Sequence, residues 1–282
     1  MTSDDRAPGR RRGAAWHVAP IALWALVGAS CGAPRLTLPT GPGEPAADGA
    51  SVVAEATAAC RAVSSLVAEG AVSGSVDGRR VRGRLHLGVA EPASARLEAV
   101  APFGQPLFIL VARDGRATLV LTRPDRVLEH DDPGQVLEAL TGIPLDPADL
   151  RATLTGCAEP PAVPDARRLG VDWRIVSSAT TDLYFRRDSS SASWRLVARV
   201  RRDAGRMGWR VEYQDFAGAF PRTLRFVGDD RGRFDLRVAL SQVEHNLPLG
   251  AEAFRVRIPA GAAPLTLEEL RERGPLGGLD GP

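Results

Sequence analysis

Hydrophobic and polar residues alternate with a period of two through most of the chain. In residues 81–89 the apolar side chains Val81, Leu85, Leu87 and Val89 stand at odd positions and Arg82, Arg84 and His86 at even ones. The same rhythm recurs in 194–201, 209–214, 234–241 and 254–258. This period is typical of half-buried strands. With turn-forming connectors between the runs, it predicts roughly a dozen antiparallel strands. One face of the sheet is expected to be apolar and the other to carry arginine.

Helical patterns are few and short. An amphipathic helix is predicted over residues 52–67, and a short helical pair over 135–140 and 148–154. The second helix of the pair follows Asp146 and a proline, the expected cap and first helical position. A last helix is predicted over 265–273, where Thr266 and a glutamate three positions on form a capping box.

These elements predict a fold of the α+β class that is mainly β. A sheet with one apolar face needs a cover, and so few helices cannot fill the surface of a dozen strands. We therefore expect an antiparallel open (half) β-barrel with a helical lid and an apolar hollow between them. The pattern is equally compatible with a filled β-sandwich core that has no cavity.

The charge of the chain narrows the class of partner. It has 282 residues, a net charge of +2 and 36 basic residues, all of them arginine. Residues 1–30 carry the whole excess, so the remainder is neutral. A nucleic-acid-binding protein needs a basic surface on its folded part, and we expect none here.

The N-terminus has the organisation of an export signal. An arginine-bearing segment precedes the apolar run 14–27, after which come small residues and Cys31. This predicts a lipoprotein signal peptide over 1–30 and lipidation of Cys31, although Gly28 stands where lipoprotein signals usually have leucine. An ordinary signal peptide followed by an incidental cysteine is the alternative. The Pro- and Gly-rich stretch 31–51 is predicted to be a flexible tether that carries the lipidated cysteine.

The rest of the chain then divides into a folded domain over residues 52–260 and a C-terminal short helix and tail over 261–282. Within the domain the only cysteines are Cys60 and Cys157. An even pair in an exported protein favours a disulfide, and their wide separation argues against a redox motif. Two free thiols remain the alternative.

The chain contains no motif that indicates catalysis or a metal site. It has no Gly-x-Ser-x-Gly, His-Glu-x-x-His, P-loop or dinucleotide fingerprint. Its histidines, among them His86, His130 and His245, show no ligand-type spacing. We therefore expect no enzyme activity, no cofactor and no bound metal.

Several stretches resemble the outer-membrane lipoprotein receptor family LolB. They are residues 95–104, the following strands 107–111 and 119–121, and above all the helical pair introduced by Leu-Thr-Gly-Ile-Pro at 140–144 and ending at Gly156. Beyond Gly156 only the strand rhythm continues the likeness, down to 254–259. The loop 88–94 lacks the leucine that LolB exposes for membrane insertion, with only Val89 as a replacement.

The resemblance implies an open β-barrel with a helical lid, shared by LolB, the periplasmic carrier LolA and mycobacterial lipid carriers. It implies binding of lipoprotein acyl chains or lipid, delivery by a periplasmic LolA-like carrier, and attachment to the outer membrane through the N-terminal lipid of a monomer. A structural or interaction lipoprotein with the same fold is the alternative. The residues expected to line the acyl-chain cavity are Leu85, Leu87, Leu97, Leu107, Ile109, Leu119, Leu121, Leu137, Leu140, Ile143, Leu150, Trp173, Trp194, Trp209, Val211, Leu224, Phe226, Leu236 and Val238.

Overall fold

A computed structural model of the protein describes residues 35–101, 106–130, 132–159, 165–190, 192–203, 206–228 and 234–274. The chain divides into two compact units, Met1–Leu36 and Thr37–Pro282. The second unit holds every helix and strand named below and is described by itself. The predicted signal peptide, residues 1–30, and Cys31 lie outside the described residues.

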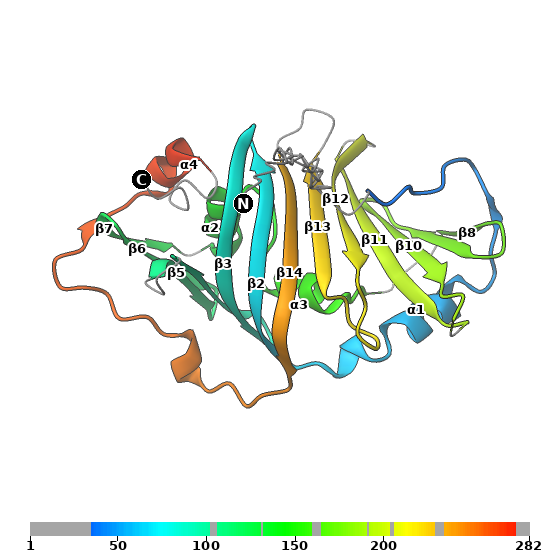
Figure 1. The fold of residues 1–282 in the computed structure, drawn as a ribbon, viewed down its shortest axis with the longest axis horizontal. Coiled ribbons are helices and arrows are strands. Elements are labelled where there is room, and N and C mark those ends of the chain that lie inside the picture. Colours follow the sequence, from blue (N-terminus) through cyan, green and yellow to red (C-terminus); the bar gives the residue numbers. More distant parts are fainter. Residues whose placement is uncertain are drawn as a thin grey trace, which may run out of the picture. The chain divides into compact units, whose positions relative to one another are not determined.

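The unit is built on one 15-stranded sheet, whose strand order is β1-β8-β9-β10-β11-β12-β13-β14-β2-β3-β4-β5-β6-β7-β15. All pairs are antiparallel except the short contact between β15 and β7. The two halves of the meander join where β14 pairs with β2, at the centre of Figure 1. The strands are β1 (Glu44–Pro45), β2 (Ser65–Val76), β3 (Arg79–Ala90), β4 (Ser94–Val100), β5 (Pro106–Arg113), β6 (Arg116–Thr122), β7 (Asp125–His130), β8 (Asp165–Leu169), β9 (Trp173–Ser177), β10 (Thr181–Arg187), β11 (Trp194–Asp203), β12 (Arg206–Gln214), β13 (Thr223–Gly228), β14 (Phe234–His245) and β15 (Ala263–Pro264).

Turn chemistry explains the regular meander. Asp77 and Gly78 join β2 to β3 with φ angles of 47° and 78°, the left-handed backbone that a two-residue hairpin turn requires. Asp114 and Gly115 repeat this turn between β5 and β6, with φ angles of 51° and 76°. The sheet does not close on itself, because its end strands β1 and β15 pair only with β8 and β7. The predicted open antiparallel barrel is confirmed.

The helices lie against one face of this sheet, here called the inner face. Helix α1 contacts β8–β11, α3 contacts β2–β4, α2 contacts β6, and α4 packs on α2. In the described part of the chain, no helix is both long enough and apolar enough to cross a bilayer. The helices are α1 (Gly49–Thr57), α2 (Pro133–Thr141), α3 (Pro147–Thr155) and α4 (Leu267–Arg273), with the 3₁₀ turns η1 (Cys60–Ala62) and η2 (Ala251–Phe254).

The N-terminal boundary differs from the prediction. Strand β1 pairs with β8, and α1 begins at Gly49, so the end of the predicted tether 31–51 belongs to the folded unit. The helix expected over 52–67 ends at Thr57, and β2 starts at Ser65. The apolar pattern from 63 to 67 is compatible with either a helix or a strand. Residues from Ser65 onward form a strand because they pair with β14 and β3.

The strand expected at 254–258 is absent. Residues 246–262 instead form a long connection from β14 towards β15, the orange segment of Figure 1, and η2 within it contacts β4 and β5 on the opposite, outer face of the sheet. Phe254 is buried there, and Arg96 Nη1 donates to the backbone oxygen of Arg255 at 2.8 Å. The Arg96 side chain thus holds this segment against the sheet by a hydrogen bond to its backbone, where no strand pairing is formed.

Elsewhere several arginines of the outer face are ion-paired rather than freely solvated. Arg210 Nη2 lies 2.6 Å from Glu212 Oε1, and the Glu212 side chain is fully buried. Arg225 Nε lies 2.8 Å from an oxygen of Asp235. Planar guanidinium groups suit such carboxylate pairing, and their aliphatic stems cover the sheet.

Acidification towards pH 2 is expected to loosen α4. Hydrogen bonds from the Thr266 backbone and from Arg126 lower the pKa of Glu269 from 4.5 to about 2. Because the folded pKa is the lower one, the stabilisation is complete above pH 4.5 and is lost as the pH falls towards 2. NMR titration of the Glu269 carboxyl carbon and the α4 amides checks this. A Glu269 pKa near 4.5, or α4 amide signals that stay unchanged while Glu269 protonates, would contradict it.

Candidate functional site

An apolar hollow lies between the inner face of the sheet and the helical pair α2–α3. Its volume is about 80 Å³. Apart from the Thr141 side chain its lining is entirely apolar, and strands from both halves of the sheet contribute. The lining residues are Val72, Leu85, Leu87, Leu97, Leu137, Thr141, Ile143, Leu145, Leu150, Leu154, Phe226, Leu236 and Val238. We call this the apolar cavity.

The structure brings about half of the predicted cavity residues together. The predicted residues that line the cavity are Leu85, Leu87, Leu97, Leu137, Ile143, Leu150, Phe226, Leu236 and Val238. Others share the inner face or the helices without lining it, and they are Leu119, Leu121, Leu140, Trp194, Trp209, Val211 and Leu224. These residues extend the core to either side of the cavity.

Three residues that were predicted to line the cavity lie on the outer face of the sheet instead. Leu107 and Ile109 lie on the outer face of β5, because their neighbours Phe108 and Leu110 oppose inner-face residues of β4. The run 107–111 is continuously apolar, so its pattern does not select a face. Trp173 also lies on the outer face, under the guanidinium of Arg186 at 5.5 Å. A cation–π contact holds this ring outside the core.

The cavity also contains residues that the sequence pattern missed. Val72 lies in a Gly-, Ala- and Ser-rich part of β2, where no strong alternation marks it. Leu145, Leu154 and Thr141 also line the cavity, although none of them is among the residues predicted to do so. The Thr141 hydroxyl is in fact satisfied within the helix by the backbone oxygen of Leu137, at 2.7 Å. A helical threonine whose hydroxyl is bonded internally can present its methyl group to an apolar space.

Local sequence explains how α2 and α3 are placed over the cavity. Asp132 and Asp146 accept hydrogen bonds from the backbone of Gln135 and Asp149, capping the two helices. A proline follows each cap at the first helical position, and a left-handed glycine ends each helix. The predicted helical pair is therefore confirmed, with each helix slightly longer than expected.

A disulfide fixes the far end of α3. Cys60 of η1 bonds to Cys157, just beyond α3, with a Cα–Cα distance of 5.5 Å. In addition, Arg151 Nη1 donates to the Val63 backbone oxygen at 2.9 Å. These links join α3 to the segment that leads into β2. The predicted pairing of the two cysteines is confirmed.

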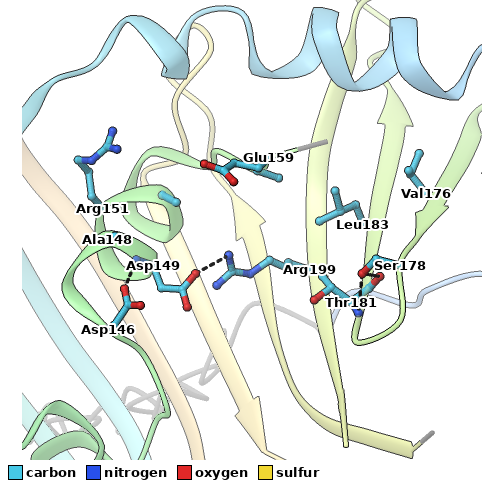
Figure 2. Close-up of a pocket in the computed structure, with 12 residues that line it drawn as sticks. Asp146, Ala148, Asp149, Arg151, Glu159, Val176, Ser178, Thr181, Leu183 and Arg199 are labelled. Atoms are coloured by element: carbon cyan, nitrogen blue, oxygen red, sulfur yellow. Dashed lines mark hydrogen bonds and ion pairs between the residues drawn. The ribbon is translucent and has the colours of Figure 1, made fainter. Parts of the chain in front are cut away.

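A second, polar hollow of about 460 Å³ lies on the other side of α3, between that helix and β9–β11. Figure 2 shows Arg199 reaching from β11 towards Asp149 of α3. We call it the polar pocket. Its lining residues are Asp146, Ala148, Asp149, Arg151, Ala152, Ala158, Glu159, Val176, Ser178, Thr181, Leu183 and Arg199.

Arg199 corrects the expectation that the arginines of β11 all lie on the outer, solvated face. A bulge between β10 and β11 makes Phe185 pair with Leu196 while Tyr184 pairs with Ala198. The extra residue reverses the face of everything that follows. Arg199 consequently lies on the inner face opposite Leu183, and it is only 7% exposed.

Apart from the side that faces the polar pocket, Arg199 is packed among aromatic and apolar side chains. Tyr213 lies on the same inner face, and burial raises the pKa of its phenol to about 12. Arg199 also lies against the Trp209 ring, with 5.7 Å between its guanidinium carbon and the ring centroid. A cation in such a setting is strongly attracted to a counter-charge, because little water screens it.

Two further sequence expectations concern the site. Val89, the proposed replacement for the LolB loop leucine, is fully buried at the end of β3 and is not available to a membrane. In the described ranges, no three side chains among histidine, cysteine, aspartate and glutamate come together as a group able to hold a metal ion.

Comparison with known proteins finds similarity in structure but not in sequence. No protein-family model and no curated protein matches the chain. A LolA superfamily protein from Nitrosomonas europaea superposes with a TM-score of 0.50 and 10% identity, covering 74% of this chain and 97% of that one.

Two other solved structures are similar to a lesser degree. A DUF1329 family protein from Desulfovibrio piger gives a TM-score of 0.48 at 10% identity, over 75% of this chain and 98% of that one. An outer membrane lipoprotein-sorting protein domain from Vibrio parahaemolyticus gives 0.47 at 12%, over 74% and 96%. The likeness to the Nitrosomonas protein concerns the fold: the open sheet and its helical cover form a LolA-like fold.

Proposed function

We propose that this protein is a lipid-anchored carrier that holds acyl chains between its sheet and the helical pair α2–α3. The observation that carries the proposal is the apolar cavity, whose wall is hydrocarbon apart from Thr141. Exposing an acyl chain to water costs about 0.8 kcal/mol per methylene. A dry apolar wall removes that cost without selecting for chain length.

The size of the cavity sets a condition on this function. Ligand pockets usually measure about 300–1,000 Å³, whereas the apolar cavity is about 80 Å³. An acyl chain therefore enters only if α2 and the start of α3 move away from the sheet, while the end of α3 stays held by the Cys60–Cys157 disulfide. Short helices on the surface of a sheet can move in this way at lower cost than the sheet can deform.

Mass spectrometry of the protein purified under native conditions tests the proposal. We expect co-purified lipid or acylated peptide, and we expect it to be depleted when cavity residues are made polar. The small volume also favours a second candidate, a structural or interaction lipoprotein whose core is filled. Absence of ligand, with no uptake of added triacylated lipopeptide, would support that candidate.

The anchor is proposed from the sequence, where Cys31 follows an apolar run and small residues. Replacing Cys31 by serine is expected to move the exported protein from the membrane fraction to the soluble periplasmic fraction and to abolish palmitate labelling. Fractionation and metabolic labelling measure this. Unchanged membrane association would contradict the anchor, and a matched Ser30→Ala variant should behave as the wild type.

We further propose that the carrier acts at the periplasmic side of the outer membrane, in lipoprotein localisation and by binding rather than catalysis. A depletion strain tests this part. Outer-membrane lipoproteins should accumulate at the wrong site, and correct sorting without the protein would leave a general lipid carrier.

A further inference from the structure

Arg199 is a buried cation that uses few of its hydrogen-bond donors. A guanidinium has five N–H groups, of which one Nη2 proton goes to Thr153 Oγ1 at 3.1 Å. Nη1 lies 3.6 Å from Asp149 Oδ1, beyond hydrogen-bonding distance, and Nε has no hydrogen-bond partner in the described part of the chain. Buried polar groups are normally satisfied, and a guanidinium bonds most strongly to phosphate or carboxylate oxygens.

The polar pocket gives this cation direct access to a ligand. Arg199 is one of the pocket's lining residues, and its side chain is only 8% exposed. Figure 2 shows it reaching across the hollow from β11. The other lining arginine, Arg151, is engaged, since it contacts the Val63 backbone oxygen and lies 3.5 Å from Glu91. Arg199 is therefore the guanidinium that is placed to bind an oxyanion in this pocket by donating hydrogen bonds to it.

Carboxylates at the same pocket make a simple anion a poor occupant. Asp146 and Glu159 line it and are exposed, and Asp149 faces the guanidinium. An incoming group thus meets a positive charge inside and negative charges nearer to solvent. A ligand with an oxyanion and an ammonium matches both, whereas an anion alone meets repulsion from the carboxylates.

Helix α3 separates the polar pocket from the apolar cavity. Leu150 and Leu154 face the cavity, while Asp149 and Ala152 of the same helix line the pocket. At the start of the helix, Leu145 lines the cavity and its neighbour Asp146 lines the pocket. The two hollows therefore lie on opposite sides of one helix, so an amphiphile whose chains enter the cavity when the helical pair moves has its polar group next to the polar pocket.

On this basis, and resting on the proposed function, we infer that the polar pocket binds the headgroup of a phospholipid that carries both a phosphodiester and an ammonium. The phosphodiester pairs with Arg199, and the ammonium lies towards Asp146 and Glu159. The pocket thereby adds headgroup recognition to a cavity that by itself recognises only hydrocarbon.

Calorimetric titration of the full-length protein with three short-chain lipids tests the inference. The lipids are a phosphatidylethanolamine, a phosphatidylglycerol and a diacylglycerol with identical chains. We expect the phosphatidylethanolamine to bind at least tenfold more tightly than the diacylglycerol, with the phosphatidylglycerol between them. Arg199→Gln should remove the advantage of both phospholipids and leave diacylglycerol binding unchanged. Glu159→Gln should lower only the affinity for phosphatidylethanolamine.

The controls separate this inference from the proposed function. Arg201→Gln alters an exposed arginine on the same strand and should change nothing. If Arg199→Gln lowers the melting temperature, Arg199→Lys keeps the charge but loses the planar fork, and it should bind the phospholipids at an intermediate strength.

Equal affinity for all three lipids, or phospholipid binding unaffected by Arg199→Gln, would overturn the headgroup site while leaving the acyl-chain carrier intact. If none of the three lipids binds, both proposals fail. Inorganic phosphate should not displace the phosphatidylethanolamine. Displacement by phosphate would instead assign the pocket to a free anion.

Discussion

Leu85→Asp is expected to weaken the binding of a fluorescent triacylated lipopeptide about 100-fold. Leu85 lines the apolar cavity from β3 and is partly exposed, so the substitution should leave the folded sheet in place. A carboxylate at this position removes the apolar contact between the cavity wall and several methylene groups of the acyl chain. Each of these contacts contributes about 0.8 kcal/mol to binding. A loss of about 3 kcal/mol corresponds to the 100-fold change. Fluorescence titration measures it.

The matched control for this variant is Leu121→Asp. Leu121 has the same residue type, lies on the inner face of β6 and is also only partly buried, but it does not line the cavity. Its substitution should leave the affinity for lipopeptide within about twofold of the wild type. Equal losses in the two variants would show that a charge anywhere on the inner face acts by destabilising the fold, and the cavity would no longer be the binding site.

Loss of the Cys60–Cys157 disulfide is expected to lower the free energy of unfolding by about 3–5 kcal/mol. The bond closes a loop with a sequence separation of 97 residues, and long loops gain most from closure because the unfolded chain loses more entropy. For a domain of this size, that corresponds to a melting temperature lower by about 10 °C. Thermal unfolding of the double variant Cys60→Ser with Cys157→Ser measures it.

Two comparisons check that the bond itself is responsible. The wild type in a reducing agent should unfold at the temperature of the double variant, and the agent should have no further effect on that variant. A double variant as stable as the oxidised wild type would mean that the bond contributes nothing to stability.

The sequence predicted the fold well where hydrophobicity was strictly periodic. Strands such as β3 and β14 and the capped helices α2 and α3 were recognisable because alternation, caps and turn residues agree. The continuous apolar run in β5 was ambiguous, and for this reason Leu107 and Ile109 were assigned to the wrong face. Local pattern also cannot place a segment such as 246–262, whose position depends on a contact with Arg96, far away in the sequence.

The polar pocket could not be predicted from the sequence for a similar reason. Arg199 has arginines all around it in the sequence, and nothing local distinguishes it from its outer-face neighbours. Its inward position results from one extra residue in β11, and that bulge is defined only by pairing with β10. The apolar cavity is closer to what the sequence pattern predicts, because strands such as β3 and β14 each bring an alternating apolar face to the same side of the sheet.

The use of arginine for every basic side chain of the sheet has a practical consequence for identifying cargo. Because every basic side chain is an arginine, the folded unit offers no lysine amine to acylating or aldehyde reagents, and guanidinium groups keep their proton at neutral pH. An amine-directed crosslinker added to a loaded complex would therefore react with side-chain or headgroup amines of the bound molecule. The carrier itself could react only at an unmodified N-terminal amine, so a label on any other species recovered with it would identify the bound molecule.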